Sequence, residues 1–248
     1  METKPAAASQ EGRGRRVLDG DVDGWKAFVR RDPMIIPDDA SFDLEHFSVP
    51  NHYRDDVSEI MIPFGLLVDR IQKLAKDIRD YYGARTIHLL CVLKGGSAYF
   101  HELVAALRKF SEFSDHDGVP FTYDFIKVRS YQGLDSSGSV QIVGEDLLAL
   151  EDKHVLVVED IVDTGLTMSS LLPVLEARGT KSLRVTSLLE KRTARSCGYK
   201  ADYVGFSIPD KFVVGFCLDF NEAFRDMNHI CVISGKGIER FKKSSAAS

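Results

Sequence analysis

The sequence predicts an α/β fold whose central sheet is mostly parallel, twisted and flanked by helices. The clearest sign is Val155–Val158, an aliphatic run without the polar alternation of a half-exposed strand. Such a strand is typical of a parallel sheet that helices cover on both faces. A second sign is that Val155–Val158 and Ile87–Leu93 are each followed by a small-residue loop and an apolar helical pattern. Two such units predict right-handed crossovers within one sheet.

The other elements follow from local patterns. Gly65–Tyr82 is expected to be an amphipathic helix because its apolar residues recur at helical spacing. Lys94–Ser97 should connect Ile87–Leu93 to a second helix. Further strands are expected at Phe121–Val128, Leu183–Leu189, Tyr203–Phe206, Phe212–Leu218 and Ile230–Ile233. Pro173 lies two turns into the helix after the central strand, so that helix should either bend or begin its regular part later.

Length and composition indicate one globular domain. The 248 residues are 44% hydrophobic and 28% charged, which is enough to bury a sizeable core. Residues 1–32 are small, polar and glycine-containing, so we expect a flexible extension, with the domain at 33–243 and a flexible tail at 244–248. Trp25 and Phe28 interrupt the extension and could dock on the body, dock on a neighbouring subunit or stay mobile.

Several classes of protein are disfavoured. A net charge of -5 provides no basic surface for nucleic acid. No apolar stretch is long enough to span a bilayer, and the amino terminus lacks a signal-peptide core, so a membrane partner is not expected. The four cysteines form no CxxC pair and fit small core residues in a reducing compartment. We therefore expect a cytoplasmic location.

The residues after the central strand predict a phosphate site. Glu159 and Asp160 follow the strand, and Asp163-Thr164-Gly165-Leu166-Thr167 leads into a helix. Free N–H groups at a helix start, a glycine and two hydroxyls together favour an anion. Carboxylates beside a phosphate would repel it unless the ligand also carries hydroxyls, a divalent cation or both. The pattern therefore indicates a sugar phosphate with a metal, whereas the plain alternative is a solvated acidic loop with a common turn.

The full order from Val155 to Thr167 is improbable by chance. It resembles the phosphoribosyl pyrophosphate (PRPP) signature of type I phosphoribosyltransferases. Other loops resemble those of the eukaryotic hypoxanthine-guanine phosphoribosyltransferases, in the order of that family and over about residues 33–241. These are Leu93–Gly96, Val128–Tyr131, Glu190–Thr193, Phe206–Gly215 and Asp219–Asp226.

The resemblance implies a type I phosphoribosyltransferase fold with a small base-binding hood built from the termini. It implies a purine salvage enzyme that transfers the 5-phosphoribosyl group from PRPP to N9 of hypoxanthine, guanine or xanthine, giving pyrophosphate and a nucleotide such as IMP or GMP. Mg²⁺ would be the cofactor, and PRPP, the purine base and a second copy of the chain, in a homodimer or homotetramer, would be the partners. The alternative is a catalytically weak homologue that senses PRPP or nucleotides.

The resemblance also assigns residues. The ribose 5-phosphate would be bound by Glu159, Asp160, Asp163, Thr164, Gly165, Leu166 and Thr167. Asp163 would be the general acid/base at purine N7. Pyrophosphate would be bound by Lys94, Gly95, Arg225, Ser130 and Tyr131. The purine would be bound by Ile161, Lys191, Phe212, Val213 and Asp219. The metal ligands would be Asp219, Glu159 and Asp160.

Two conformational expectations come with the resemblance. A cis peptide is expected at Leu93-Lys94, and Arg129–Val143 is expected to close as a lid over pyrophosphate, where a plain flexible loop is the alternative. Leu166 stands where the family commonly has lysine, which removes one charge contact to the phosphate.

Each assigned residue also has a plainer interpretation. Asp163 could hold a turn, Lys191 could be a solvated surface group, and Phe212 could be a core residue. Asp219 and Arg225 could simply pair with each other.

Overall fold

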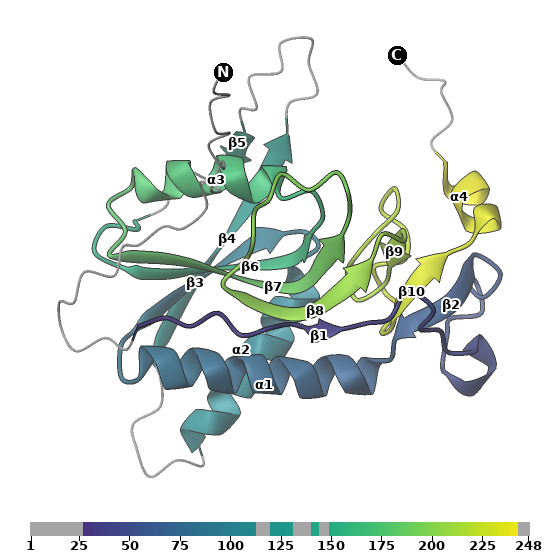
Figure 1. Ribbon diagram of the computed structural model, residues 1–248, viewed down its shortest axis with the longest axis horizontal. Coiled ribbons are helices and arrows are strands. Elements are labelled where there is room, and N and C mark those ends of the chain that lie inside the picture. The colour runs from purple at the N-terminus through teal and green to yellow at the C-terminus, as the bar shows by residue number, and fades with distance from the viewer. Residues whose placement is uncertain (1–26, 113–119, 131–139, 144–148, 243–248) are drawn as a thin grey trace, which may run out of the picture.

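The computed structural model describes residues 27–112, 120–130, 140–143 and 149–242 of the chain (Figure 1). Its centre is a seven-stranded sheet with the order β1-β8-β7-β6-β3-β4-β5. All neighbouring strands are parallel except β4 and β5. The predicted α/β class with a mostly parallel sheet is confirmed. The strands are β1 (Met34–Ile35), β3 (Ile87–Leu93), β4 (Phe121–Ser130), β5 (Val140–Val143), β6 (His154–Val162), β7 (Ser182–Arg192) and β8 (Tyr203–Pro209).

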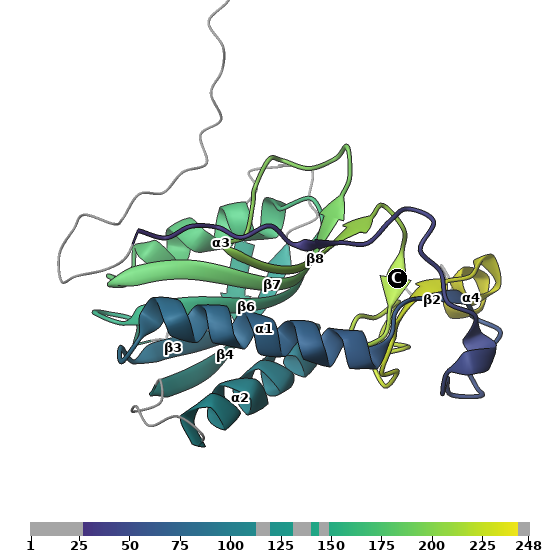
Figure 2. The ribbon, with the colours of Figure 1, turned by 60° about the horizontal axis from the view of Figure 1, so that its bottom comes forward.

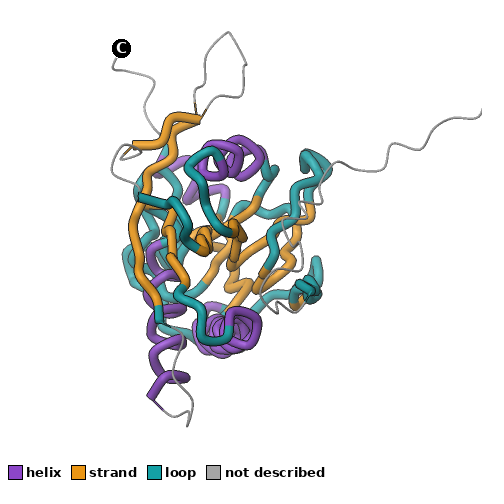
Figure 3. Tube along the Cα trace, turned by 90° about the vertical axis from the view of Figure 1, so that its left-hand side faces the viewer, coloured by secondary structure: helices purple, strands orange, loops and turns teal. Residues whose placement is uncertain are grey.

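Helices cover both faces of this sheet. α1 (Phe64–Tyr82) and α2 (Ser97–Glu112) lie on one face and α3 (Leu166–Glu176) on the other (Figures 2 and 3). The central strand β6 shows why both faces must be covered. Alternate residues of a strand point to opposite faces, so Leu156 and Val158 pack in the core under α1 and α2, while Val155 and Val157 pack in the core under α3.

A second, smaller sheet forms the hood expected from the termini. It pairs β2 (Val57–Ile62) with β10 (Ile230–Ile233) and β10 with β9 (Val213–Val214), all antiparallel. The short 3-10 helix Leu44–His46 and α4 (Gly235–Phe241) lie beside it, at the right of Figure 1. Its core is separate from the main one and contains Val57, Ile60, Phe224, Met227 and Cys231.

Four predicted elements differ in the structure. The strand expected at Phe212–Leu218 is wrong, because only β9 is extended before the chain turns through positive φ angles of 93° at Gly215, 51° at Phe216 and 70° at Cys217. β6 and β7 are longer than expected and include acidic and basic site residues at their ends. For the helix that contains Pro173, the alternative that its regular part begins later is also wrong, because α3 begins at Leu166.

The described part of the amino-terminal segment runs along the edge of the sheet. β1 pairs with β8 in parallel, and Phe28 packs edge-on against Tyr81 and Tyr203, both at 5.2 Å between ring centroids. Of the predicted extension, 1–26 lie outside the described residues. Among the helices that the structure describes, none is long and apolar enough to cross a membrane.

Candidate functional site

The predicted site residues gather at one edge of the main sheet and on the adjoining hood. β3, β6 and β7 are parallel, so their carboxyl ends and the loops that follow them lie at the same edge. These ends carry Lys94, Asp163 and Lys191. The chain after β9 adds Asp219 and Arg225, and it makes contact with the β3–α2 loop through Ser97, whose Oγ lies 3.3 Å from Cys217 Sγ.

The loop between β6 and α3 has the geometry of an anion site. Gly165 has φ of 83° and is the residue before α3, which has no acidic residue in its first turn and no side-chain cap. The first N–H groups of a helix have no partner within it, and the Leu166 N–H makes only a long hydrogen bond of 3.4 Å to Thr164 Oγ1, so these groups can bind an anion. A loop from the β7–β8 connection supports the turn from behind, since Cys197 N–H donates to the Thr164 carbonyl at 2.8 Å. Leu166 and Thr167 are exposed at the helix start.

Glu159 and Asp160 lie on the last part of β6. Glu159 is 7% exposed, and burial, together with the adjacent Asp160, raises the pKa of its carboxyl well above the usual range. A Cβ on Gly95 would lie 1.7 Å from Asp160 Oδ2, so a side chain at this position would have to displace the carboxylate. The β3–α2 loop and the end of β6 therefore meet at the Gly95–Asp160 contact.

Asp163 lies between two cations. Its Oδ2 is 3.2 Å from Lys191 Nζ and its Oδ1 is 3.5 Å from Arg195 Nη2. Arg195 is also 3.5 Å from Asp210, which accepts a hydrogen bond from Thr193 Oγ1 at 2.7 Å. Lys191 lies on β7 and is only 9% exposed, which argues against a solvated surface lysine. A buried lysine beside a half-exposed carboxylate makes a polar pair that a small ligand can reach.

A chain of charged groups connects the β3–α2 loop with the turns after β9. Lys94 Nζ donates to Glu222 Oε2 at 2.7 Å, and Glu222 Oε1 lies 3.5 Å from Arg225 Nη2. Arg225 also pairs with Asp219 at 2.8 Å and donates to the Cys217 carbonyl at 2.7 Å. The hydrogen bond from Lys94 and the nearby Arg225 lower the pKa of the Glu222 carboxyl. Mutual pairing of Asp219 and Arg225, the plainer of the two interpretations, is therefore present here.

The remaining predicted positions differ in how the structure places them. Phe212 is 50% exposed and lies just before β9, and its ring centroid is 5.4 Å from that of Phe220. It is therefore not a core residue. Val213 is buried on β9, and Ile161 packs partly against the main core. The Leu93-Lys94 peptide is cis, which confirms that expectation. Ser130 ends β4, whereas Tyr131 and the centre of the expected lid lie outside the described residues.

Sequence reasoning missed Arg195 and Glu222. Arg195 stands four residues after Lys191 in a loop, and no periodicity links it to Asp163 in the loop after β6. Glu222 had a local signal, since it stands three residues before Arg225. Its contact with Lys94, however, joins positions far apart in the chain.

The carboxylates of the site fit a metal that arrives with a phosphorylated substrate. Among the described residues, no three acidic, histidine or cysteine side chains form a cluster that could hold an ion. Mg²⁺ commonly takes only one or two protein carboxylates and completes its shell with substrate phosphates and water. Glu159 is a buried carboxyl whose charged form the fold itself disfavours. A cation beside Glu159 and Asp160 would favour that charged form.

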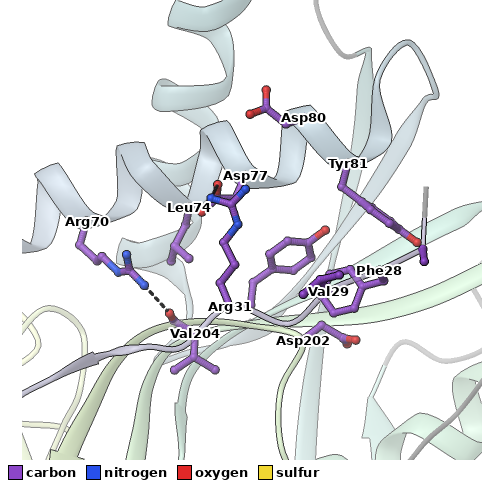
Figure 4. Close-up of a pocket in the computed structure, with 12 residues that line it drawn as sticks. Phe28, Val29, Arg31, Arg70, Leu74, Asp77, Asp80, Tyr81, Asp202 and Val204 are labelled. Atoms are coloured by element: carbon purple, nitrogen blue, oxygen red, sulfur yellow. Dashed lines mark hydrogen bonds and ion pairs between the residues drawn. The ribbon is translucent and has the colours of Figure 1, made fainter. Parts of the chain in front are cut away.

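A cavity of about 450 Å³ lies away from these loops (Figure 4). It is an open pocket lined by Ala27, Phe28, Val29 and Arg31 with parts of α1 and the beginning of β8, where Arg70 donates to the Val204 carbonyl at 3.1 Å and Arg31 pairs with Asp77 at 2.6 Å. Since β8 is parallel to β6 and β7, its beginning lies at the opposite edge of the sheet from the candidate site.

The fold and the site together define the class of protein. A parallel sheet presents a helix-start anion loop after its central strand, two acidic residues beside it, and a lysine–aspartate pair facing the same edge. A helix-start loop beside acidic residues suits a phosphorylated sugar. These features are those of a phosphoribosyltransferase.

Comparison with known proteins identifies the family. The family described as "Phosphoribosyl transferase domain" matches residues 65–221, more than half of the chain. The hypoxanthine-guanine phosphoribosyltransferases of Rattus norvegicus and Homo sapiens are each 47% identical to the chain over 210 residues, covering 84% of this chain and 96% of theirs. The crystal structure of the Schistosoma mansoni enzyme in complex with IMP has a TM-score of 0.72 and 37% identity, covering 85% of this chain and 100% of that one. The chain belongs to the hypoxanthine-guanine phosphoribosyltransferase family.

Proposed function

We propose that the protein transfers the 5-phosphoribosyl group of PRPP to N9 of a 6-oxopurine and releases pyrophosphate. Hypoxanthine and guanine would give IMP and GMP, so the protein is a purine salvage transferase. The observation that carries the proposal is the position of the Lys191–Asp163 pair next to the anion loop that begins α3. A base held by the pair and a phosphate held by the loop are the two ends of a purine nucleotide.

The anion loop would hold the ribose 5-phosphate. The N–H groups of Gly165, Leu166 and Thr167 lie at the start of α3, and the hydroxyls of Thr164 and Thr167 add two donors. Glu159 and Asp160 would accept hydrogen bonds from the ribose hydroxyls. Fixing the ribose at both its phosphate and its hydroxyls leaves C1′ as the free end that faces the base.

The lysine–aspartate pair would read the purine and handle its proton. Lys191 is a pure donor, so it suits the O6 carbonyl of a 6-oxopurine and rejects the amino group of adenine. Asp163 would take or give the proton at N7, which contributes about 10²–10⁴-fold to the rate. The exposed ring of Phe212 would stack on the base, and the backbones of Val213 and Asp219 would face its 2-position.

The charged side chains that connect the β3–α2 loop with the turns after β9 would bind pyrophosphate. Arg225 offers a forked guanidinium, and Lys94 and the Gly95 backbone approach from the β3–α2 loop. Asp219, Glu159 and Asp160 do not form a three-ligand cluster by themselves, so they would hold Mg²⁺ together with substrate phosphates and water, and the ion would neutralise the negative charge on the leaving pyrophosphate. Ser130 and Tyr131 would cover pyrophosphate as part of a lid that excludes water.

The cellular setting belongs to the same proposal. We expect a cytoplasmic homo-oligomer, a dimer or a tetramer, with PRPP and a purine base as small-molecule partners and without nucleic-acid or membrane partners. The rival function, a sensor of PRPP or nucleotides with weak turnover, would not need both Asp163 and Lys191. Their mutual contact at 3.2 Å supports the enzyme.

Initial rates test the proposal. The full chain is mixed with Mg²⁺, PRPP and, in turn, hypoxanthine, guanine, xanthine and adenine, and nucleotide and pyrophosphate are quantified together. Stoichiometric IMP or GMP and pyrophosphate, with adenine inactive, is the expected result. Binding of PRPP without turnover on any of the four bases would instead support the sensor.

A further inference from the structure

Glu222 occupies an anionic position between two cations of the site. Its Oε2 accepts a hydrogen bond from Lys94 Nζ at 2.7 Å, and its Oε1 lies 3.5 Å from Arg225 Nη2. The side chains of Lys94 and Glu222 are 51% and 61% exposed, so the pair is open to solvent and to a ligand. A phosphate oxygen placed between the same two donors would make equivalent contacts.

The backbone holds Glu222 in a conformation that glutamate rarely adopts. Phe220 and Ala223 exchange backbone hydrogen bonds of 3.3 and 3.1 Å, which leaves Asn221 and Glu222 as a two-residue hairpin loop. Their φ angles are 52° and 72°. Two positive angles are characteristic of a type I′ turn, in which asparagine suits the first position and glycine is strongly preferred at the second. Local backbone preference therefore does not explain a glutamate here.

Neighbouring contacts fix the turn on both sides. The Glu222 N–H donates to Asp219 Oδ2 at 2.7 Å, and Asn221 Nδ2 donates to the Phe241 carbonyl at 2.8 Å. With its backbone held in this way, the Glu222 side chain extends to the two cations. Asp219 and Glu222 together balance the charges of Lys94 and Arg225, so these four side chains carry no net charge.

We propose that Glu222 is an internal competitor for pyrophosphate, whose carboxylate occupies the place of a phosphate group between Lys94 and Arg225 until the ligand displaces it. This inference rests on the proposed function, which assigns these two cations to pyrophosphate. Each binding event must replace one anion by another, which lowers the affinity for PRPP. Each release is assisted, because the carboxylate returns to the cations as pyrophosphate leaves.

Direct binding of pyrophosphate tests the inference. Its Kd is measured by titration calorimetry with Mg²⁺ for the wild-type chain, Glu222→Gln and Glu222→Gly. Both variants should bind about two- to fivefold more tightly, the size expected from an exposed ion pair. The gain should shrink between about 50 mM and 500 mM salt, because exposed charges are screened. The KM for PRPP should fall in parallel, and kcat should fall where release limits turnover.

Two controls separate this role from a structural one. Glu45→Gln removes a similarly exposed carboxylate that pairs with Arg54 and not with a residue of the site, so it changes the net charge equally and should leave Kd unchanged. Glu222→Gly suits the positive φ of the turn, so its fold should be at least as stable as the wild type. Tighter binding by both Glu222 variants then cannot come from a damaged turn.

Other outcomes are equally informative. Unchanged or weaker pyrophosphate binding by Glu222→Gln would overturn the inference, because the carboxylate would then be inert or would hold the cations in place for the ligand. In that case, weaker binding by Lys94→Ala would leave the proposed function standing. A wild-type chain that does not bind pyrophosphate at all would overturn both.

Discussion

Replacement of Gly165 by alanine perturbs the anion loop where the structure leaves least room. The residue has φ of 83°, a region that disfavours side chains with a Cβ. A Cβ at this position would lie 2.8 Å from Tyr199 Cβ and 3.0 Å from Cys197 Sγ. The first of these neighbours is an atom close to the backbone, so it cannot simply rotate away.

Two costs combine in this variant. The positive φ costs about 1–2 kcal/mol for alanine. Overpacking against a well-filled neighbour adds about 1–3 kcal/mol. We therefore expect Gly165→Ala to lower the free energy of unfolding by roughly 2–5 kcal/mol. Gly198 is a matched control, because its φ is 86° but a Cβ there would meet no atom within 4 Å, so Gly198→Ala should show only the first cost.

Urea unfolding of both variants measures the difference, and steady-state kinetics gives the KM for PRPP. Gly165→Ala should lose more stability than Gly198→Ala and should raise the KM, because the helix start must shift away from Tyr199. Equal losses of stability in the two variants would refute the packing argument. An unchanged KM in Gly165→Ala would refute the role of this loop in binding phosphate.

Three further predictions address the base site and the core. Asp163→Asn should reduce kcat by about 10²–10⁴-fold while IMP still binds, and turnover within severalfold of wild type would exclude Asp163 as general acid/base. Lys191→Gln should weaken the selectivity for hypoxanthine over adenine, whereas Lys181→Gln, just before the other end of β7, should not. Burial lowers the pKa of His88, His154 and His229, so the unfolded chain takes up more protons as the pH falls below about 6.5. These histidines lower the free energy of unfolding from pH 7.5 to about pH 5.5, whereas the raised pKa of Glu159 acts in the opposite sense because the folded state then takes up the proton. In urea titrations the decrease should therefore be steeper in Glu159→Gln than in the wild type, and equal slopes would contradict this linkage.

The parts of the fold that the sequence predicts well are those with strong local patterns. α1 follows from apolar residues at helical spacing, β6 follows from the unbroken aliphatic run Val155–Val158, and β3 follows from a largely apolar run. The anion loop is also local, because its strand, acids, glycine and helix start are contiguous in the chain. Their relation to the ligand therefore follows once the strand is placed in a parallel sheet.

The parts that the sequence predicts poorly depend on contacts between distant segments. The apolar residues after β9 have strand-like composition, yet Phe216 and Cys217 adopt positive φ angles in a tight turn between Gly215 and Leu218. A Cβ on Gly215 would lie 2.1 Å from the His229 carbonyl, so the close approach of the chain before β10 shapes this turn. Arg195 joins the site through a contact with Asp163 that spacing does not encode, and the local spacing of Glu222 to Arg225 does not predict its contact with the distant Lys94.

We expect the turn between β6 and α3 to bind the 5′-phosphate of a purine nucleotide, while Asp163 and Lys191 contact the purine ring. Titration of the isotopically labelled protein with IMP, followed by backbone amide chemical shifts, measures this binding. The largest shifts should occur at Thr164, Gly165, Leu166 and Thr167, and they should saturate together with that of Lys191. Saturable binding of IMP that leaves these four amides unchanged would contradict it.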